Sequence, residues 1–122
     1  MFFINKLFLF FLFSFLIPAV TQYALGQPTK SNLQLQEALI NNNLRDVQMA
    51  IDAGADVNAP DSSGDRPLMY AALYSSIDCM KLLLDDHANP NEKNNAGETA
   101  LMCCTQDFDK VKLLINRKHF IF

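Results

Sequence analysis

The chain repeats itself at a fixed spacing of 33 residues over most of its length. Apolar residues, alanines, asparagines and glycines coincide when the sequence is shifted by that distance. The coinciding positions are Leu35 with Leu68 and Leu101, Ala38 with Ala71 and Cys104, Val47 with Met80, Met49 with Leu82, Ile51 with Leu84, Ala55 with Ala88, Asn58 with Asn91, and Gly64 with Gly97. A period of this length indicates small units that stack and bury their apolar faces against one another.

The residues of the central unit predict two short helices joined by a tight turn. Pro67 suits the first position of a helix, where no N–H is needed, and Leu68 and Ala71 follow it on one face. Ser75 and Ser76 predict the turn. The second helix is indicated by an apolar stripe at spacings of three and four residues, formed by Ile77, Met80, Leu83 and Leu84.

Residues suited to left-handed backbone predict the helix ends and the loops between units. Gly54 follows the second helix of the first unit, and His87 takes the same place in the next. We therefore interpret His87 as a helix terminator rather than a ligand. Gly64 and Gly97 supply positive φ at the tips of the connecting loops, and Asp61 is expected to hydrogen-bond its own backbone there.

This unit resembles the ankyrin repeat, whose 33-residue period and Thr-Pro-Leu-His-x-Ala signature are matched here by Pro67, Leu68 and Ala71. The resemblance covers residues 31–118, divided into repeats of about 31–60, 61–93 and 94–118. It implies an all-α repeat solenoid, in which helix-turn-helix units are joined by short β-hairpin loops.

The first and third units depart from the central pattern. Ser31 and Gln34 have the spacing of a capping box, which predicts that the first helix starts at Ser31. In the third unit Ala100 replaces the proline, and we expect the hydroxyl of Thr99 to cap the helix. The turn that follows is two residues shorter, and Phe108 is expected to fill core space.

The end of the chain lacks a polar capping unit. After Arg117 the repeat pattern gives way to residues 118–122, of which 119–122 form an apolar tail. The last helix is therefore expected to leave an apolar flank bare, unless Phe120, Ile121 and Phe122 fold over it or a partner covers it.

Residues 1–26 have the layout of a secretory signal peptide. A run of 11 residues from Leu7 to Ile17, apolar except for Ser14, follows Lys6 and ends at Pro18. Ala24 and Gly26 suit a cleavage site that would make Gln27 the first mature residue. The chain is thus expected to be exported, periplasmic or secreted. The alternative is an uncleaved membrane anchor formed by residues 1–17.

Three cysteines, Cys79, Cys103 and Cys104, remain in the exported part. Since adjacent helical residues point about 100° apart, Cys103 and Cys104 do not form a metal-binding pair. We expect all three to pack as small apolar residues. A disulfide from Cys79 to either of the others stays open.

Composition and motifs point away from nucleic-acid binding and from catalysis. Only one of the 10 basic residues lies in the leader, which leaves nine against 13 acidic residues, a net charge of -4. The chain contains neither a glycine-rich phosphate loop nor a HExxH motif, and its two histidines are 32 residues apart. No cofactor, metal site or enzymatic activity is expected.

The resemblance implies a non-catalytic module that binds another protein through its concave face and loop tips. Tyr74 is the strongest single candidate, because a large amphipathic ring gives contact area at low entropic cost. The candidate contact residues are Ser62, Ser63, Asp65, Leu73, Tyr74, Asn95, Ala96, Glu98 and Gln106. The alternatives are a membrane-anchored or self-associating structural element and a truncated remnant of a longer array.

Overall fold

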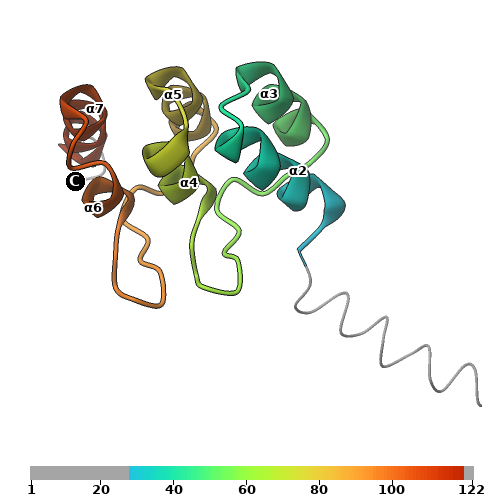
Figure 1. The fold of residues 1–122 in the computed structure, drawn as a ribbon, viewed down its shortest axis with the longest axis horizontal. Helices are drawn as coiled ribbons and strands as arrows, with labels where there is room; N and C mark the ends of the chain where they lie inside the picture. The colour runs from blue at the N-terminus through green and yellow to red at the C-terminus, as the bar shows by residue number, and fades with distance from the viewer. Residues whose placement is uncertain (1–27, 120–122) are drawn as a thin grey trace, which may run out of the picture.

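The computed structural model describes residues 28–119, which form six α-helices arranged as three pairs. The helices are α2 (Lys30–Ile40), α3 (Leu44–Asp52), α4 (Pro67–Tyr74), α5 (Ile77–Asp85), α6 (Ala100–Cys103) and α7 (Phe108–His119). The pairs α2/α3, α4/α5 and α6/α7, called here the first, middle and third units, stand side by side in a row (Figure 1). The helical solenoid expected from the 33-residue period is thereby confirmed.

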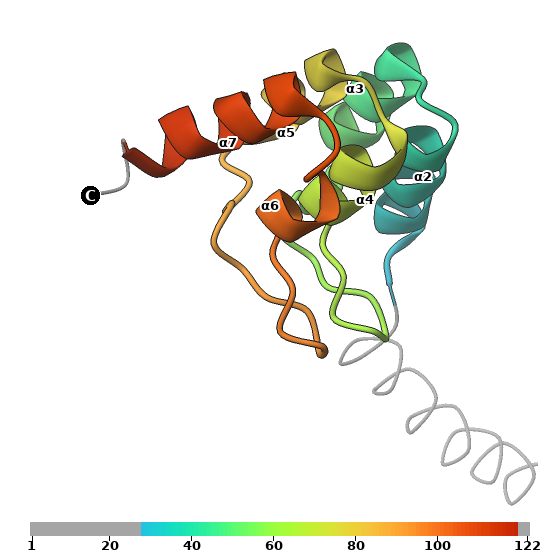
Figure 2. The same ribbon diagram turned by 60° about the vertical axis from the view of Figure 1, so that its left-hand side comes forward.

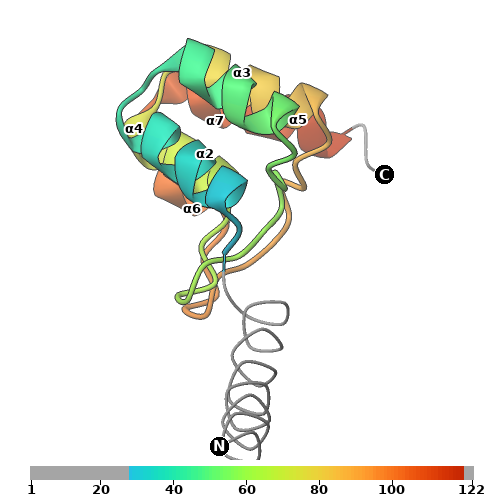
Figure 3. The same ribbon diagram turned by 90° about the vertical axis from the view of Figure 1, so that its right-hand side faces the viewer.

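The helices lie in two layers, with the connecting loops below them. Helices α2, α4 and α6 form one layer, and α3, α5 and α7 form the other (Figure 2). The loops over residues 53–66 and 86–99 extend to the same side and pass beneath the layer of first helices (Figure 3). Residues 28–119 contain no β-strand, so the loops are turn-shaped rather than the expected β-hairpins.

The aligned apolar positions form one continuous core between the units. Leu35 and Leu68, which coincide in the period, are both almost fully buried, and Ala38, Ala71 and Cys104 are buried together. The largest side chains with essentially no exposure are Leu35, Leu39, Val47, Leu68, Met69, Cys79, Met80, Leu83 and Leu114. Each unit therefore buries apolar surface both between its own two helices and against its neighbours, as stacked repeats require.

The left-handed residues expected at the helix ends are confirmed. Gly54 has φ of +93° and His87 has φ of +70°. His87 terminates α5, and its carbonyl oxygen accepts a hydrogen bond of 3.1 Å from Nδ2 of Asn58 in the preceding loop. Asn42 also has positive φ, at +52°, a feature that the period did not indicate.

The two expected side-chain caps are wrong. Helix α2 begins at Lys30, and the hydroxyl oxygen of Thr29 accepts the hydrogen bond from the backbone N–H of Asn32. Ser31 thus lies inside the first turn, and its hydroxyl donates to the carbonyl of Ala53 at 3.1 Å, which ties the two helices of the unit together. Thr99 is the N-cap residue of α6, but its side chain makes no capping hydrogen bond.

Phe108 does not fill core space, because its side chain is 77% exposed. It lies six residues before the buried Leu114, and that spacing places the two side chains about 120° apart around α7. The core position next to the middle unit is taken instead by the buried Lys110. The Nζ of Lys110 donates to the carbonyl of Ala72 at 3.1 Å and lies 3.8 Å from Oδ2 of Asp107.

Two expectations lie outside the described residues. They are the leader of residues 1–26, with its alternative as an anchor over residues 1–17, and the folding back of residues 120–122. Over residues 28–119, no helix combines the length and the apolar character needed to cross a membrane.

Candidate functional site

The tips of the two loops lie directly against each other. The backbone N–H of Asn95 donates to the carbonyl of Ser63 at 3.0 Å, and its Nδ2 lies 3.3 Å from the carbonyl oxygen of Ser62. A Cβ atom on Gly64 would come within 2.6 Å of Oδ1 of Asn95. The contact between the tips therefore requires glycine at position 64, in addition to its positive φ of +78°.

Equivalent residues, 33 positions apart, hold the two loops in the same conformation. Oδ1 of Asp61 accepts hydrogen bonds from the backbone N–H groups of Ser63 and Asp65, at 2.8 and 2.9 Å. Oδ1 of Asn94 accepts in the same way from Ala96 and Glu98, at 3.0 and 2.9 Å. The expected role of Asp61 as a turn residue is confirmed, and Asn94 repeats it.

Asn94 also brings two carboxylates of neighbouring loops together. Its Nδ2 donates to Oδ1 of Asp65 at 2.7 Å and to Oε2 of Glu98 at 3.0 Å. Asn94 was not among the candidate residues. Its position 33 residues after Asp61 was the signal that could have revealed it.

Two tyrosines of α4 connect this loop cluster to the first-helix layer. The hydroxyl of Tyr70 donates to Oδ2 of Asp61 at 2.5 Å, and the rings of Tyr70 and Tyr74 stack with centroids 6.3 Å apart. Burial, followed by the hydrogen bond to Asp61 and the charges of Asp61 and Asp65, raises the pKa of Tyr70 well above its ordinary value. The side chain of Tyr70 is thus neutral and half-buried, and the 54% exposed ring of Tyr74 stacks on it.

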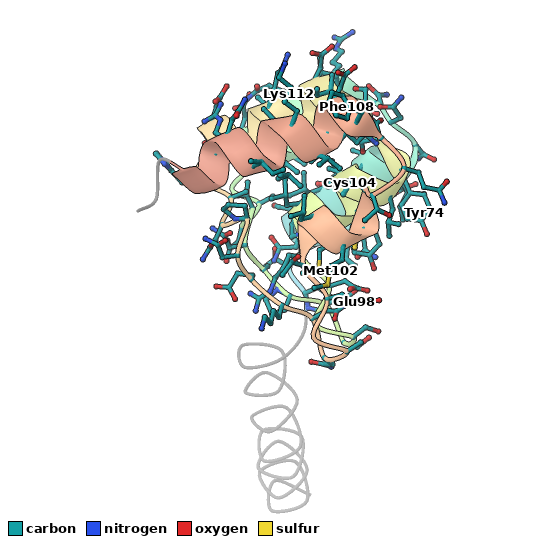
Figure 4. The ribbon with its side chains drawn as sticks, turned by 90° about the vertical axis from the view of Figure 1, so that its left-hand side faces the viewer. Tyr74, Glu98, Met102, Cys104, Phe108 and Lys112 are labelled. Carbon is teal, nitrogen blue, oxygen red and sulfur yellow. The ribbon has the colours of Figure 1, made fainter. Side chains whose placement is uncertain are left out.

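The structure places the nine candidate residues in two groups. The loop group is Ser62, Ser63, Asp65, Asn95, Ala96 and Glu98, all exposed except the half-buried Asp65. The helix-end group is Leu73, Tyr74 and Gln106, all exposed. The Tyr70–Asp61 hydrogen bond and the tyrosine stack link the loop group to Tyr74. Tyr74 and Glu98 lie toward the same side of the molecule (Figure 4). Together the two groups are called here the concave surface.

The three cysteines are free, and two of them are buried. Cys79 and Cys104 are buried as expected, whereas Cys103 is only half-buried. Burial and the charges of Glu98 and Asp65 raise the pKa of Cys103, and burial raises that of Cys104 despite the nearby Lys110. Both thiols are therefore protonated at neutral pH, which makes them poor nucleophiles. The Sγ of Cys79 lies 3.8 Å from Oδ1 of Asn42.

Within residues 28–119, no three side chains among histidine, cysteine, aspartate and glutamate lie close enough to hold a metal ion. His87 is exposed at the end of α5, in the left-handed conformation described above.

Comparison with known protein families agrees with the helix pairs and loops. The family model for ankyrin repeats, in three copies, matches residues 35–121, more than half of the chain. The chain belongs to the ankyrin repeat family. Ankyrin repeats generally mediate protein–protein interaction, and the family is generally non-enzymatic.

Its ankyrin relatives include proteins with unrelated names. The chain is 32% identical over 87 residues to a putative ankyrin repeat protein, FPV219, of Fowlpox virus, covering 68% of this chain and 20% of the relative. It is 29% identical over 96 residues to the ankyrin repeat, SAM and basic leucine zipper domain-containing protein 1 of Neofelis nebulosa, covering 74% and 20%. It is 29% identical over 91 residues to the mitochondrial disaggregase of Bos taurus, covering 75% and 13%. The chain thus spans a fifth or less of these relatives, whose names do not point to one shared partner.

Proposed function

We propose that this chain is a non-catalytic module that binds a partner protein through its concave surface. The observation that carries the proposal is Tyr74, a large ring exposed over 54% of its surface yet held by stacking on Tyr70. A fixed aromatic ring loses little conformational freedom on binding, and such residues often dominate the energy of protein interfaces. Leu73 beside it adds further exposed apolar area.

The charges of the concave surface favour a partner segment that carries arginine or lysine. The charged members of the surface are Asp65 and Glu98, both acidic. One carboxylate oxygen of each accepts a hydrogen bond from Nδ2 of Asn94. Within residues 28–119, the other oxygen of each accepts no hydrogen bond. A guanidinium or ammonium group would supply donors to these oxygens, and charge-assisted hydrogen bonds are stronger than neutral ones.

The leader supports the proposal that this interaction takes place outside the cytoplasm. Residues 1–26 combine Lys6, an apolar run over 7–17 and small residues before Gln27, which is the pattern of a secretory signal. We infer that the ankyrin domain is exported, to the periplasm or the medium. The intact mass of protein recovered from an exporting host tests this: a chain starting at Gln27 supports export with cleavage, and a mass that includes Met1 supports an anchor.

Site-specific photo-crosslinking tests the proposed binding surface. The crosslinking amino acid p-benzoylphenylalanine replaces Tyr74 in one variant and Lys81 in the control. Lys81 is also exposed but lies on α5, in the other helix layer. We expect position 74 to crosslink a discrete partner and position 81 to crosslink none.

The captured partner then allows the affinity itself to be measured. Tyr74→Ala is expected to weaken binding by about tenfold or more, while Lys81→Ala leaves it unchanged. Affinity is also expected to fall with added salt, because part of it comes from the carboxylates of Asp65 and Glu98. Crosslinking from position 81 but not from position 74 would overturn the proposal.

A further inference from the structure

The third unit leaves bare a surface that the middle unit buries. Met69 of the middle unit is 2% exposed, whereas its counterpart Met102 is 57% exposed. Leu84 is 7% exposed, and Ile115, its counterpart after the two-residue shortening of the turn, is 49% exposed. Met102, Phe108 and Ile115 form the surface called here the C-terminal end face. Figure 4 views the molecule from this end and labels Met102 and Phe108. An apolar surface of this kind marks an interaction site.

The middle unit shows what packs against the equivalent surface inside the chain. In the middle unit the same surface packs against the next helix pair, with Lys110 bonded to the carbonyl of Ala72 and Arg117 paired with Asp85 at 2.5 Å. The first and middle units meet in the same way, through a buried hydrogen bond of 2.6 Å from Ser75 to the carbonyl of Leu39. The C-terminal end face therefore continues an interface that the chain uses internally.

The opposite end of the row offers a matching surface. Met49 on α3 is 58% exposed, although its counterpart Leu82 in the middle unit packs partly against the core. A hollow between α2 and α3 has Met49 and small residues in its lining, together with Glu37 and Asp46. Asp46 takes the place of Cys79 in the middle unit, whose Sγ lies 3.8 Å from Oδ1 of Asn42 in the first unit. The residues lining this hollow, called here the N-terminal end face, are Gln34, Glu37, Ala38, Asn41, Asp46, Met49, Ala50 and Ala53.

We propose that the C-terminal end face binds the N-terminal end face of a second copy of this chain, which extends the solenoid head to tail. The two faces lie at opposite ends of the row of units (Figure 1), so both remain available when the concave surface is occupied. Because the contact joins two different surfaces, it is heterologous, and a pair of chains still presents one free face at each end for the next chain.

Two single variants separate this arrangement from a symmetric dimer. Phe108→Asp disables the C-terminal end face and Met49→Asp disables the N-terminal one, and both side chains are exposed enough for the fold to tolerate the change. Sedimentation velocity is measured over a range of concentrations on protein recovered after expression of the full chain in an exporting host. The wild type is expected to form species that grow with concentration, and each variant alone is expected to be monomeric. An equimolar mixture of the two variants is expected to form a dimer that grows no further, because each partner keeps one intact face.

The control is Leu73→Asp, which changes the concave surface and is expected to leave the assembly unchanged. A wild type that stays monomeric at all concentrations overturns the proposal. Dimers of Met49→Asp, with monomers of Phe108→Asp and no mixed dimer, would show a two-fold pairing of C-terminal end faces instead. Association that neither variant reduces would place the contact elsewhere, for example in residues 1–27.

Discussion

The hydroxyl of Tyr70 donates a hydrogen bond of 2.5 Å to Oδ2 of Asp61, and this bond joins α4 to the loop between the first and middle units. The other oxygen of Asp61 holds the backbone of Ser63 and Asp65. Tyr74 in turn stacks on the ring of Tyr70. One side chain thus connects the exposed aromatic ring of the concave surface to its loop tips.

Tyr70→Phe is expected to lower the free energy of unfolding by about 1 kcal/mol at pH 7, the typical contribution of one hydrogen bond. The folded protein raises the pKa of Tyr70, so this stabilisation is fully present below about pH 10, the pKa of an unfolded tyrosine. It is lost progressively as the pH rises above that value, because only the unfolded chain then releases the proton. Urea unfolding of both proteins at pH 7 and about pH 11 measures the difference. A gap between wild type and variant that does not narrow at the higher pH would contradict this explanation.

Gly64→Ala and Gly97→Ala form a matched pair that tests the contact between the loop tips. Both glycines have positive φ, at +78° and +80°, so each substitution is expected to cost about 1 kcal/mol of backbone strain. Only at Gly64 would the new Cβ also clash with Asn95, since nothing lies within 4 Å of the equivalent position at Gly97. We therefore expect Gly64→Ala to destabilise the protein by at least about 1 kcal/mol more than Gly97→Ala in urea unfolding. Equal losses would mean that the tips do not touch in solution.

His87→Gly is expected to stabilise the protein, although it removes a side chain. The left-handed backbone at φ of +70° costs a non-glycine residue about 1 to 2 kcal/mol. Glycine avoids that cost but adds flexibility to the unfolded chain, so a net gain of about 0.5 kcal/mol is expected. Thermal unfolding followed by circular dichroism measures the change. A lower melting temperature would show that the His87 side chain stabilises the end of α5.

The thiols of the folded protein are expected to react slowly with iodoacetamide at neutral pH. Cys79 and Cys104 are buried, and the pKa of the half-buried Cys103 is raised by burial and by Glu98 and Asp65. Mass spectrometry over time measures the labelling, with Cys103→Ser identifying the contribution of that residue. In urea all three thiols are expected to react at the rate of a free cysteine. Labelling of native Cys103 at the unfolded rate would contradict the raised pKa.

The 33-residue spacing predicted the helix pairs, the aligned core residues and the left-handed turns, because each depends on residues close together in the sequence. The predictions were wrong where contacts between residues far apart in the sequence determine the structure. Ser31 hydrogen-bonds across its unit to Ala53 rather than capping α2, and Lys110 takes a core position because Ala72 of the middle unit offers it a carbonyl. Phe108 is exposed because it lies about 120° around α7 from the buried Leu114.

The members of the candidate surface came from the resemblance to the ankyrin repeat, and all of them except the half-buried Asp65 are exposed. The contacts that connect them were not predicted. The links that hold them, from Tyr70 to Asp61 and from Asn94 to both Asp65 and Glu98, cross between α4 and its loop or between neighbouring loops. Such links depend on three-dimensional packing that spacing alone does not encode.

The most direct test of the proposed function is to map the captured partner onto the chain by ¹H–¹⁵N NMR titration. We predict that the backbone amide signals of Ser62, Tyr74, Asn95 and Glu98 shift or broaden as partner is added, while those of Lys81 and of Phe108 on the C-terminal end face stay in place. Changes concentrated on α5 and α7, with the concave surface unaffected, would contradict the proposal that this ankyrin domain binds its partner through the concave surface.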